Sequence, residues 1–511
     1  MKVALTVIDF LRRAELVYGD RIGVIDEPDQ PAESWGELTY KRVAELARAQ
    51  AAGLDRLGIG QGERVAIVSQ NSARLMTSFF GVSGSGRILV PINFRLNADE
   101  VAYIVEHSGA SVLLVDPELD ESLSGVTAKY RYVIGAAADH ELLAFDQEPV
   151  PWEPDEDATA TINYTSGTTA RPKGVQLTHR NIWINAATFG WQTGVTDRDV
   201  YLHTLPMFHC NGWGMPYAVT GMGGQNIVLR KVDGGEILRR VDTYGVSLLC
   251  GAPAVVAMTL DAASKWDGPI PGAGRTRMVV AGAPPPTRTI ERIETELGWE
   301  FIQIYGLTET SPFLVMNRSR AEYDDLTPGE RASRLSRAGA PALGIEMAVD
   351  AEGEVLARGN VILEGYWDQP EATAAAIVDG WFHTGDGGSI DDESYVTISD
   401  RKKDVIISGG ENVSSIEVED TLFSHPAVAE VAVIGVPDEK WGETVIALVV
   451  LAPGQSATEE ELIAHCRSKL AHFKCPTHVE FRPELARTAT GKLQKFKLRA
   501  PFWEGRERLV N

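Results

Sequence analysis

A polar loop at residues 164–174 contains residue types that can hold a phosphate group. It reads Tyr-Thr-Ser-Gly-Thr-Thr-Ala-Arg-Pro-Lys-Gly. Gly167 allows backbone N–H groups to approach an anion, the neighbouring hydroxyls add hydrogen-bond donors, and Lys173 adds a positive charge. A polar surface turn is the alternative interpretation of such a loop.

The loop does not follow the Walker pattern. That pattern requires glycine directly before the lysine and Ser or Thr directly after it, whereas Pro172 and Gly174 stand there. The P-loop NTPases are therefore excluded, and phosphate binding in another class of enzyme needs support from the rest of the chain.

Two further polar segments follow strand-like runs of apolar residues. Residues 282–284 come after the run 278–281, and residues 305–309 come after the run 301–304. In open α/β sheets, ligands collect beyond the carboxyl ends of the strands. Both segments are therefore candidates to share a ligand with the loop.

The elements that must position these segments alternate between helical and strand patterns. Apolar residues recur at helical spacing over 43–57, with Thr39 as a cap and Gly58 as a stop, and Thr178 can cap a helix that starts at His179. Buried strands are predicted at 64–68, 111–115, 160–164, 226–229, 246–250, 278–281 and 301–304. This alternation predicts an α/β domain in which helices cover parallel sheets.

The pattern changes from about residue 338. Short β-like runs with glycine turns predict a small β subdomain, and the polar segment 399–404 is a candidate hinge. The remaining residues form a separate α+β unit by length, with strands at 430–434 and 445–450 and a Thr458–Glu461 capping box that starts a helix through Leu470. The predicted domains are 1–399 and 400–511.

The composition excludes several classes of function. Hydrophobic residues make up 44% of the 511 residues, which suits a large core and opposes disorder. The formal net charge of −23 argues against nucleic-acid binding and against adhesion to an anionic membrane. The four cysteines form no C-x-x-C pair, and the apolar runs are too short for a signal peptide or a membrane span. We expect a cytoplasmic protein without stable membrane insertion.

Eight motifs in a fixed order resemble those of the adenylate-forming acyl-CoA synthetases, which are related to luciferases and to peptide-synthetase adenylation domains. They are TSGTTARPKG (165–174), FHCNGW (208–213), AGAPPP (281–286), YGLTET (305–310), WFHTGD (381–386), DRKKD (400–404), SGGENV (408–413) and TATGKLQK (488–495). Each motif is modest evidence alone, but together they span nearly the whole chain and are very specific.

The resemblance implies a two-step reaction. A carboxylate attacks ATP to give acyl-AMP and pyrophosphate, and the thiol of coenzyme A then displaces AMP. The implied partners are a small-molecule carboxylic acid, ATP, coenzyme A and Mg²⁺, and a homodimer is compatible with the family. The residues implied to hold the β- and γ-phosphates are Thr165, Ser166, Gly167, Thr168, Thr169 and Lys173. Glu309 would hold Mg²⁺ together with Thr165.

The same resemblance implies an adenosine site. Tyr305 would stack on adenine, Asp386 would accept hydrogen bonds from the ribose hydroxyls, and Arg401 would donate to the same sugar. The residues implied to shape the slot are Gly282, Ala283, Pro284, Gly306, Leu307 and Thr308. A core tyrosine and a turn aspartate are the alternatives for Tyr305 and Asp386.

Catalysis would come from both domains. Lys492 would bridge the carboxylate and the α-phosphate as charge builds, after the C-terminal domain rotates about Asp400. A second pose would present the loop that lines the coenzyme A tunnel. The residues implied to contact coenzyme A are Lys403, Ser408, Gly409, Gly410, Glu411 and Trp441.

The implied acyl pocket involves His209, Trp213, Gly282 and Gly306, with His209 as a gate between the pocket and the thiol tunnel. A packed histidine is the alternative, and a metal ligand is disfavoured because no second histidine stands at ligand spacing. Amino-acid activators carry an aspartate at the position of His209, so an α-amino acid is disfavoured. The motif form resembles ligases for short- and medium-chain, aromatic and sulfur-containing acids.

The chain departs from the family pattern at Ala170, where glycine is usual, and at Ala486, where proline is common. The first change would stiffen the loop, and the second weakens the case for control of Lys492 by acetylation. Three alternatives to an acyl-CoA ligase stay open at this point. They are an adenylation enzyme that feeds a carrier protein, a luciferase-like oxygenase and a non-catalytic nucleotide-binding protein.

Overall fold

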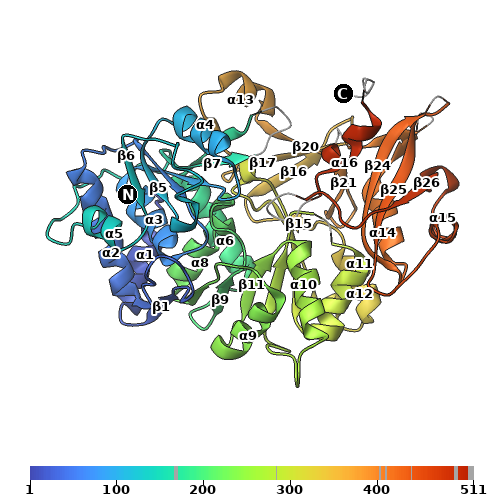
Figure 1. The fold of residues 1–511 in the computed structure, drawn as a ribbon, viewed down its shortest axis with the longest axis horizontal. Helices are drawn as coiled ribbons and strands as arrows, with labels where there is room; N and C mark the ends of the chain where they lie inside the picture. The colour runs from blue at the N-terminus through green and yellow to red at the C-terminus, as the bar shows by residue number, and fades with distance from the viewer. Residues whose placement is uncertain are drawn as a thin grey trace.

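The computed structural model describes residues 1–165, 171–283, 285–401, 404–408, 411–438, 440–487 and 493–504, apart from the side chains of residues 400, 401 and 412. Two large mixed sheets form the first part of the chain. They are followed by a small β subdomain and by an α+β unit (Figure 1).

The first sheet has nine strands in the order β15-β14-β13-β12-β11-β9-β10-β1-β2. Its central strands run parallel, whereas β2, β14 and β15 pair antiparallel at the two edges. The bounds are β1 (Ile22–Ile25), β2 (Glu37–Thr39), β9 (Val200–His203), β10 (Gln225–Val228), β11 (Leu248–Gly251), β12 (Arg277–Val280), β13 (Glu300–Tyr305), β14 (Val315–Arg318) and β15 (Ala340–Pro341).

The second sheet has seven strands in the order β18-β8-β7-β4-β3-β5-β6. Strands β7 to β6 in this order run parallel, and β8 and β18 pair antiparallel. The bounds are β3 (Arg64–Val68), β4 (Ile88–Ile92), β5 (Ala110–Val115), β6 (Tyr130–Val133), β7 (Thr159–Thr165), β8 (Lys173–Thr178) and β18 (Gly365–Tyr366).

Helices cover these sheets, and one buried core joins the two. It contains Val65 and Leu89 of the second sheet together with Tyr201 and Val279 of the first. The helix bounds are α1 (Ile8–Tyr18), α2 (Tyr40–Arg56), α3 (Ala73–Gly81), α4 (Ala98–Ser108), α5 (Ala136–Leu142), α6 (His179–Thr193), α7 (Cys210–Trp213), α8 (Met215–Met222), α9 (Gly234–Tyr244), α10 (Pro253–Ala263), α11 (Thr287–Arg292), α12 (Pro328–Leu335) and α13 (Pro370–Ala376).

The small β subdomain follows the second part of the first sheet. Its strands are β16 (Ile345–Val349), β17 (Glu354–Gly359), β19 (Ile377–Val378), β20 (Trp381–Ile390) and β21 (Val396–Arg401). They pair in the order β16-β17-β20-β19, and β21 also pairs with β20. This confirms the β-rich subdomain expected from about residue 338.

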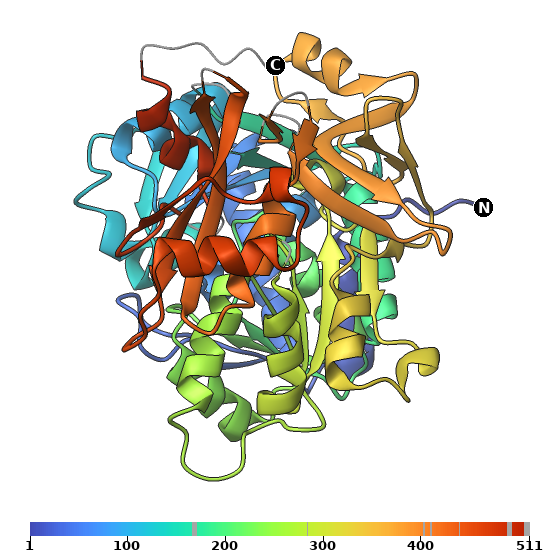
Figure 2. The ribbon, with the colours of Figure 1, turned by 90° about the vertical axis from the view of Figure 1, so that its right-hand side faces the viewer.

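The C-terminal α+β unit lies at one end of the long axis of the molecule, coloured orange to red in Figures 1 and 2. Its strands are β22 (Ile406–Ser408), β23 (Glu411–Val413), β24 (Val428–Asp438), β25 (Gly442–Leu451) and β26 (His478–Phe481), and its helices are α14 (Ser415–Phe423), α15 (Glu459–Arg467) and α16 (Lys495–Arg499). The carboxylate of Asp420 accepts hydrogen bonds from the backbone N–H and the hydroxyl of Thr287, which link α14 to α11.

The helix starts were predicted correctly where a capping side chain stands in the sequence. Thr39 Oγ1 accepts from Arg42 N, and Thr178 and Thr458 both form capping boxes. The predicted end of the helix capped by Thr458 was wrong, because this helix, α15, stops at Arg467 rather than at Leu470. Strand β8 was also missed, so the candidate phosphate loop joins two antiparallel strands rather than a strand and a helix.

The four cysteines are buried free thiols, which confirms that they form no disulfide framework. Within the ranges described above, no helix is both long enough and apolar enough to cross a membrane.

Two buried histidines make the fold sensitive to acid. Burial lowers the pKa of His179 and of His203 to about 4, so both are neutral in the folded protein at neutral pH. The unfolded chain takes up protons near pH 6.5, where the folded chain does not. Stability is therefore complete above that pH and falls as the pH drops toward about 4. We expect each buried histidine to lower the free energy of unfolding by about 2 kcal/mol at about pH 5 relative to about pH 7.5.

Urea unfolding at the two pH values measures this loss. His203→Gln removes one titrating group, and its midpoint is expected to depend less on pH than the midpoint of the unmodified chain. His472→Gln changes an exposed histidine and serves as the matched control. Equal pH dependence in all three proteins would contradict the attribution of the acid sensitivity to buried histidines.

Candidate active site

The candidate phosphate loop is the turn of the β7–β8 hairpin. Thr165 and Lys173 pair across its base, and Tyr164 pairs with Gly174. A Cβ at Gly174 would lie 2.9 Å from Ile162 Cγ2 and 3.1 Å from Tyr164 Cζ, so the close packing at this base requires glycine. The tip residues Ser166, Gly167, Thr168 and Thr169 lie outside the described residues. The hairpin does place the predicted Thr165 and Lys173 side by side.

The predicted adenine and ribose residues touch each other. Tyr305 ends β13 in the nine-stranded sheet, and its hydroxyl donates to Asp386 Oδ2 at 2.7 Å. Asp386 lies on β20 of the β subdomain and is only 7% exposed. Its backbone pairs in register with Arg401 on β21. The structure therefore joins three predicted nucleoside residues from three separate strands.

Gly306 allows the chain to turn sharply after Tyr305. A Cβ there would lie 1.5 Å from the carbonyl oxygen of Pro312, so no larger residue fits the present backbone. Leu307 then leads into a short 3₁₀ turn, η4 (Thr308–Thr310), whose central residue Glu309 is half-buried. Gly282 and Ala283 are exposed beyond the end of β12, and Pro284 lies outside the described residues.

Glu309 and Lys173 share a neighbour that the sequence did not reveal. The hydroxyl of Tyr366 donates to Glu309 Oε1 at 3.0 Å. The ammonium of Lys173 lies 4.7 Å from the centre of the Tyr366 ring. The predicted metal-binding carboxylate and the predicted phosphate-binding cation are therefore close in space.

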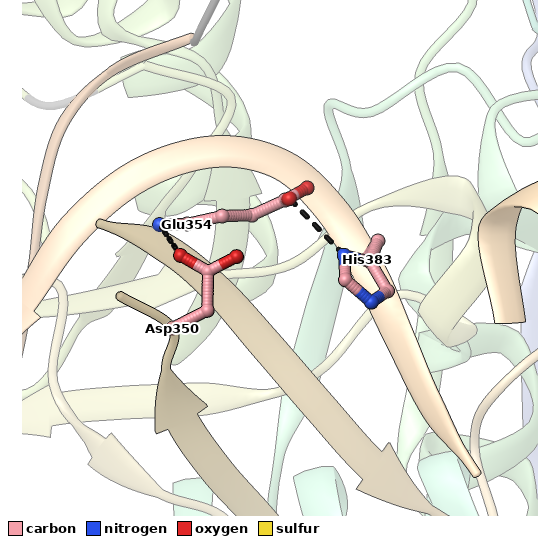
Figure 3. Close-up of side chains that lie close together, drawn as sticks. All are labelled: Asp350, Glu354 and His383. Carbon is pink, nitrogen blue, oxygen red and sulfur yellow. Dashed lines mark hydrogen bonds and ion pairs between the residues drawn. The ribbon is translucent and has the colours of Figure 1, made fainter. Parts of the chain in front are cut away.

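A buried carboxylate supports the turn that precedes Asp386. Glu354 Oε1 accepts from the backbone N–H of Gly385 at 2.8 Å. Glu354 Oε2 lies 3.1 Å from His383 Nδ1 (Figure 3). Gly385 has a φ of +73°, which favours glycine. Asp350 Oδ1 in turn accepts from Glu354 N at 2.8 Å. The sequence reasoning missed this support.

The ligand atoms of Asp350, Glu354 and His383 lie within 4.8 Å of one another, a spacing that could suit a metal ion. Their hydrogen bonds to the backbone and to each other already account for the arrangement. We therefore treat the three residues as the support of the Asp386 turn rather than as a metal site.

Replacing Glu354 by glutamine tests this support. The amide removes one acceptor and the negative charge, so the Gly385 turn and Asp386 should lose their fixed position. We expect the KM for ATP to rise about 10-fold, which corresponds to about 1.4 kcal/mol. Steady-state kinetics measure the change, with Glu352→Gln, which changes an exposed glutamate in the turn between β16 and β17, as the control. An unchanged KM for ATP would show that Glu354 does not position the site.

The segment predicted to shape the acyl pocket forms a left-handed turn. Residues 210–214 all have positive φ, from +47° to +82°, although three of them are not glycine. Such backbone costs roughly 1 to 2 kcal/mol per non-glycine residue. Buried amides hold it in place, because Asn211 bonds to Asn163 (3.1 Å) and to Thr161 (3.0 Å), and Asn185 Nδ2 donates to the carbonyl of Trp213 (3.2 Å).

This turn joins the predicted acyl-pocket residues to the site. Trp213 is buried in the main core, and His209 is half-buried directly before the turn. The Cys210 thiol lies 3.1 Å from Thr308 Oγ1, next to Glu309. The structure thus brings the 208–213 and 305–310 motifs into contact. The gating role of His209 stays a prediction.

The residues predicted to contact coenzyme A gather in one sheet of the C-terminal unit. Ser408 pairs with Glu411 in the β22–β23 hairpin and with Gly442 at the start of β25. The neighbouring Trp441 is exposed. Gly409, Gly410 and Lys403 lie outside the described residues. So does the predicted catalyst Lys492, and the side chains of Asp400 and Arg401 are not described either.

Paired α/β sheets, a hairpin with a polar tip and a separate C-terminal α+β unit define the class of enzymes that activate acids with a nucleotide. The chain belongs to the AMP-binding enzyme family, whose model matches residues 11–367. The model of the AMP-binding enzyme C-terminal domain matches residues 417–492. The resemblance to adenylate-forming acyl-CoA synthetases is confirmed, and so is the predicted fold class of a large α/β domain followed by a smaller α+β domain.

Curated relatives match almost the whole chain. A 4-hydroxybutyrate–CoA ligase of Metallosphaera sedula is 38% identical over 97% of this chain and 94% of its own length. A 2-methylpropanoate–CoA ligase of Humulus lupulus is also 38% identical over 97% of this chain and 94% of its own length. A peroxisomal acetate/butyrate–CoA ligase of Arabidopsis thaliana is 36% identical with the same coverage.

Solved structures share the fold. An anthranilate CoA ligase in complex with anthranoyl-AMP has a TM-score of 0.87, with 27% identity over 98% of both chains. An o-succinylbenzoate CoA synthetase from Bacillus subtilis, in complex with its acyl-adenylate, has a TM-score of 0.81, with 28% identity over 96% of this chain and 98% of that one.

Proposed function

We propose that this chain activates a small carboxylic acid with ATP and transfers the acyl group to coenzyme A. The contact between Tyr305 and Asp386 carries the proposal, because it joins an aromatic face for adenine to a buried carboxylate for ribose. Thr165 and Lys173 at the hairpin base, and Glu309 within η4, form the ATP end of the site in this proposal.

In the first step, a carboxylate oxygen of the acid forms a bond to the α-phosphorus of ATP, and the bond to pyrophosphate breaks. An anion attacks an anion, so the chain must supply positive charge and N–H donors around the phosphates. Lys173 and the residues of the hairpin tip serve the β- and γ-phosphates in this proposal. Lys492 neutralises charge where the carboxylate meets the α-phosphate.

Glu309 fits a role in holding Mg²⁺ together with Thr165, because carboxylate and hydroxyl oxygens are the ligands that this cation prefers. When bound, Mg²⁺ supplies charge neutralisation on the phosphate oxygens. The half-buried carboxylate of Glu309 and the Lys173 ammonium both contact Tyr366, which supports a role for Glu309 at the phosphate end of the site.

In the second step, the thiolate of coenzyme A attacks the acyl carbon, and AMP leaves with the oxygen that the acid supplied. The C-terminal unit presents Ser408, Glu411 and Trp441 to coenzyme A after it rotates about Asp400. Different groups are needed at one centre in the two steps, which gives such a rotation a physical purpose. The domain boundary at 399/400 rests on this hinge.

The acid is a short, mostly aliphatic one in this proposal. The relatives reported above act, by their names, on 4-hydroxybutyrate, 2-methylpropanoate, and acetate or butyrate. His209, where amino-acid activators carry an aspartate, offers no carboxylate to an ammonium group. We also propose a cytoplasmic location, which suits four free thiols, although one relative is peroxisomal by name.

AMP release across a panel of acids, with and without coenzyme A, tests the function. We expect turnover that requires ATP, a short-chain acid and coenzyme A together. Adenylate that forms but passes only to a carrier protein would contradict the acceptor. Light emission or oxygen consumption without a thioester product would contradict the reaction class.

A further inference from the structure

The Tyr366 side chain contacts both Glu309 and Lys173. Its hydroxyl donates to Glu309 Oε1 at 3.0 Å, and its ring face lies 4.7 Å from the Lys173 ammonium. The Glu309 carboxylate and the Lys173 ammonium therefore contact the hydroxyl and the ring face of the same rigid side chain. Neither the motifs nor the proposed function gives Tyr366 a role.

The backbone around Tyr366 is fixed on several sides. Strand β18 pairs with β8 at Tyr366 and Val175, two residues after Lys173. Thr373 Oγ1 accepts from Tyr366 N at 2.8 Å, and Trp367 N donates to the carbonyl of Gly174 at 2.7 Å. The ring is thereby held against the start of β8, where the candidate phosphate loop ends.

The same segment is tied to the η4 turn. Leu363 N donates to the backbone carbonyl of Glu309 at 2.8 Å, so β18 and η4 keep a fixed separation. The phenol can then reach the carboxylate without moving either backbone. Its ring is half-buried, and its hydroxyl donates to Glu309 Oε1.

We propose that Tyr366 is a positioning residue for the metal–triphosphate end of ATP. Its hydroxyl orients the Glu309 carboxylate toward the cation, and its ring face holds the Lys173 ammonium where the β- and γ-phosphates bind. A cation over an aromatic face is stabilised by the ring quadrupole, and a phenol that donates to a carboxylate forms a strong charge-assisted bond. This proposal rests on the roles given above to Glu309 and Lys173.

Separate measurement of adenylation and of thioester formation distinguishes this positioning role from a general structural role. The triphosphate is present during adenylation, but pyrophosphate has left before coenzyme A attacks. Tyr366 should therefore matter for ATP binding and for adenylation, and it should matter little for thioester formation from supplied acyl-AMP. A residue that only held the fold together would affect both halves.

Calorimetric titration of ATP in the absence of acid, over a series of Mg²⁺ concentrations and in EDTA, gives a readout that does not depend on turnover. Tyr366→Phe keeps the ring and removes the hydroxyl. We expect this variant to need about 10-fold more Mg²⁺ for the same gain in ATP affinity and to match the unmodified chain in EDTA. Tyr366→Leu also removes the aromatic face, and we expect it to lose affinity in EDTA as well.

Tyr103→Phe is the matched control. The Tyr103 hydroxyl donates to the carbonyl of Pro172, and its ring lies 5.0 Å from the Arg171 guanidinium, so it resembles Tyr366 except that its hydroxyl bonds to a backbone carbonyl rather than to a carboxylate. Its Mg²⁺ dependence is expected to be that of the unmodified chain. Thioester formation from supplied acyl-AMP is expected to persist in all three variants.

Unchanged Mg²⁺ dependence in Tyr366→Phe would overturn the proposal, and so would an equal loss of both half-reactions. Glu309→Gln separates this failure from a failure of the proposed function. If Glu309→Gln loses the Mg²⁺ dependence but Tyr366→Phe keeps it, only the role of Tyr366 is wrong. If the unmodified chain shows no Mg²⁺-dependent binding of ATP, the function on which the proposal rests is wrong too.

Discussion

Lys492→Ala is expected to lower acyl-adenylate formation by about 1000-fold, while thioester formation from supplied acyl-AMP keeps a rate close to that of the unmodified chain. Negative charge builds where the carboxylate oxygen meets the α-phosphate, and a single ammonium placed there stabilises the transition state by several kcal/mol. The same charge is not needed once pyrophosphate has left. Quenched-flow measurement of acyl-AMP, with chemically prepared acyl-AMP for the second step, separates the two rates.

Lys497→Ala is the control for this prediction, since Lys497 is an exposed lysine of the same basic tail. Lys495 is unsuitable, because it forms an ion pair with Glu419 at 2.7 Å inside the C-terminal unit. We expect Lys497→Ala to keep both half-reactions. An equal loss of both half-reactions in Lys492→Ala would show that the lysine supports the fold or the bound nucleotide rather than the adenylation step.

Asp386→Ala is expected to weaken both half-reactions, with the apparent affinity for ATP and for acyl-AMP lowered by about 100-fold. Two ribose hydroxyls lose a buried acceptor, and a hydrogen bond to a charged group contributes about 1.5 to 3 kcal/mol. Tyr305 also loses the carboxylate that accepts a hydrogen bond from its hydroxyl at 2.7 Å. Because the AMP moiety is bound in both steps, this pattern differs from that of Lys492→Ala.

Binding of AMP measured by calorimetry checks the effect without catalysis. Asp392→Ala, which changes an exposed aspartate between β20 and β21, is the matched control. Near-normal AMP affinity in Asp386→Ala would mean that this carboxylate only completes a turn, which was the alternative interpretation of its motif.

The sequence was sufficient for those features that depend on local chemistry. Thr39, Thr178 and Thr458 cap helices because a side-chain oxygen next to an amphipathic run satisfies free backbone N–H groups. The motifs also assigned Tyr305 and Asp386 to one nucleoside, and the two side chains touch in the structure. The capping signals lie within a few neighbouring residues, and each nucleoside residue is marked by its own motif.

Features that depend on distant partners could not be predicted. Tyr366 and Glu354 stand in ordinary strand sequences, and their roles appear only when β18 meets β8 and when β17 meets β20. The left-handed turn at 210–214 runs against local preference, because Cys and Trp rarely adopt positive φ, although Asn211 tolerates it. It is held by Asn163 and Asn185, which come from other elements. Strand β8 was missed because the polar loop before it was not recognised as a turn between two antiparallel strands.

The chain of events from acid to thioester has a direct isotopic test. An acid whose carboxylate carries heavy oxygen is incubated with the unmodified enzyme, ATP and coenzyme A, and the products are analysed by mass spectrometry. If the carboxylate attacks the α-phosphorus and the thiol then displaces AMP, one heavy oxygen atom is transferred to AMP and none to pyrophosphate. Heavy oxygen in inorganic phosphate with ADP as the second product, or AMP without label, would contradict an adenylate intermediate.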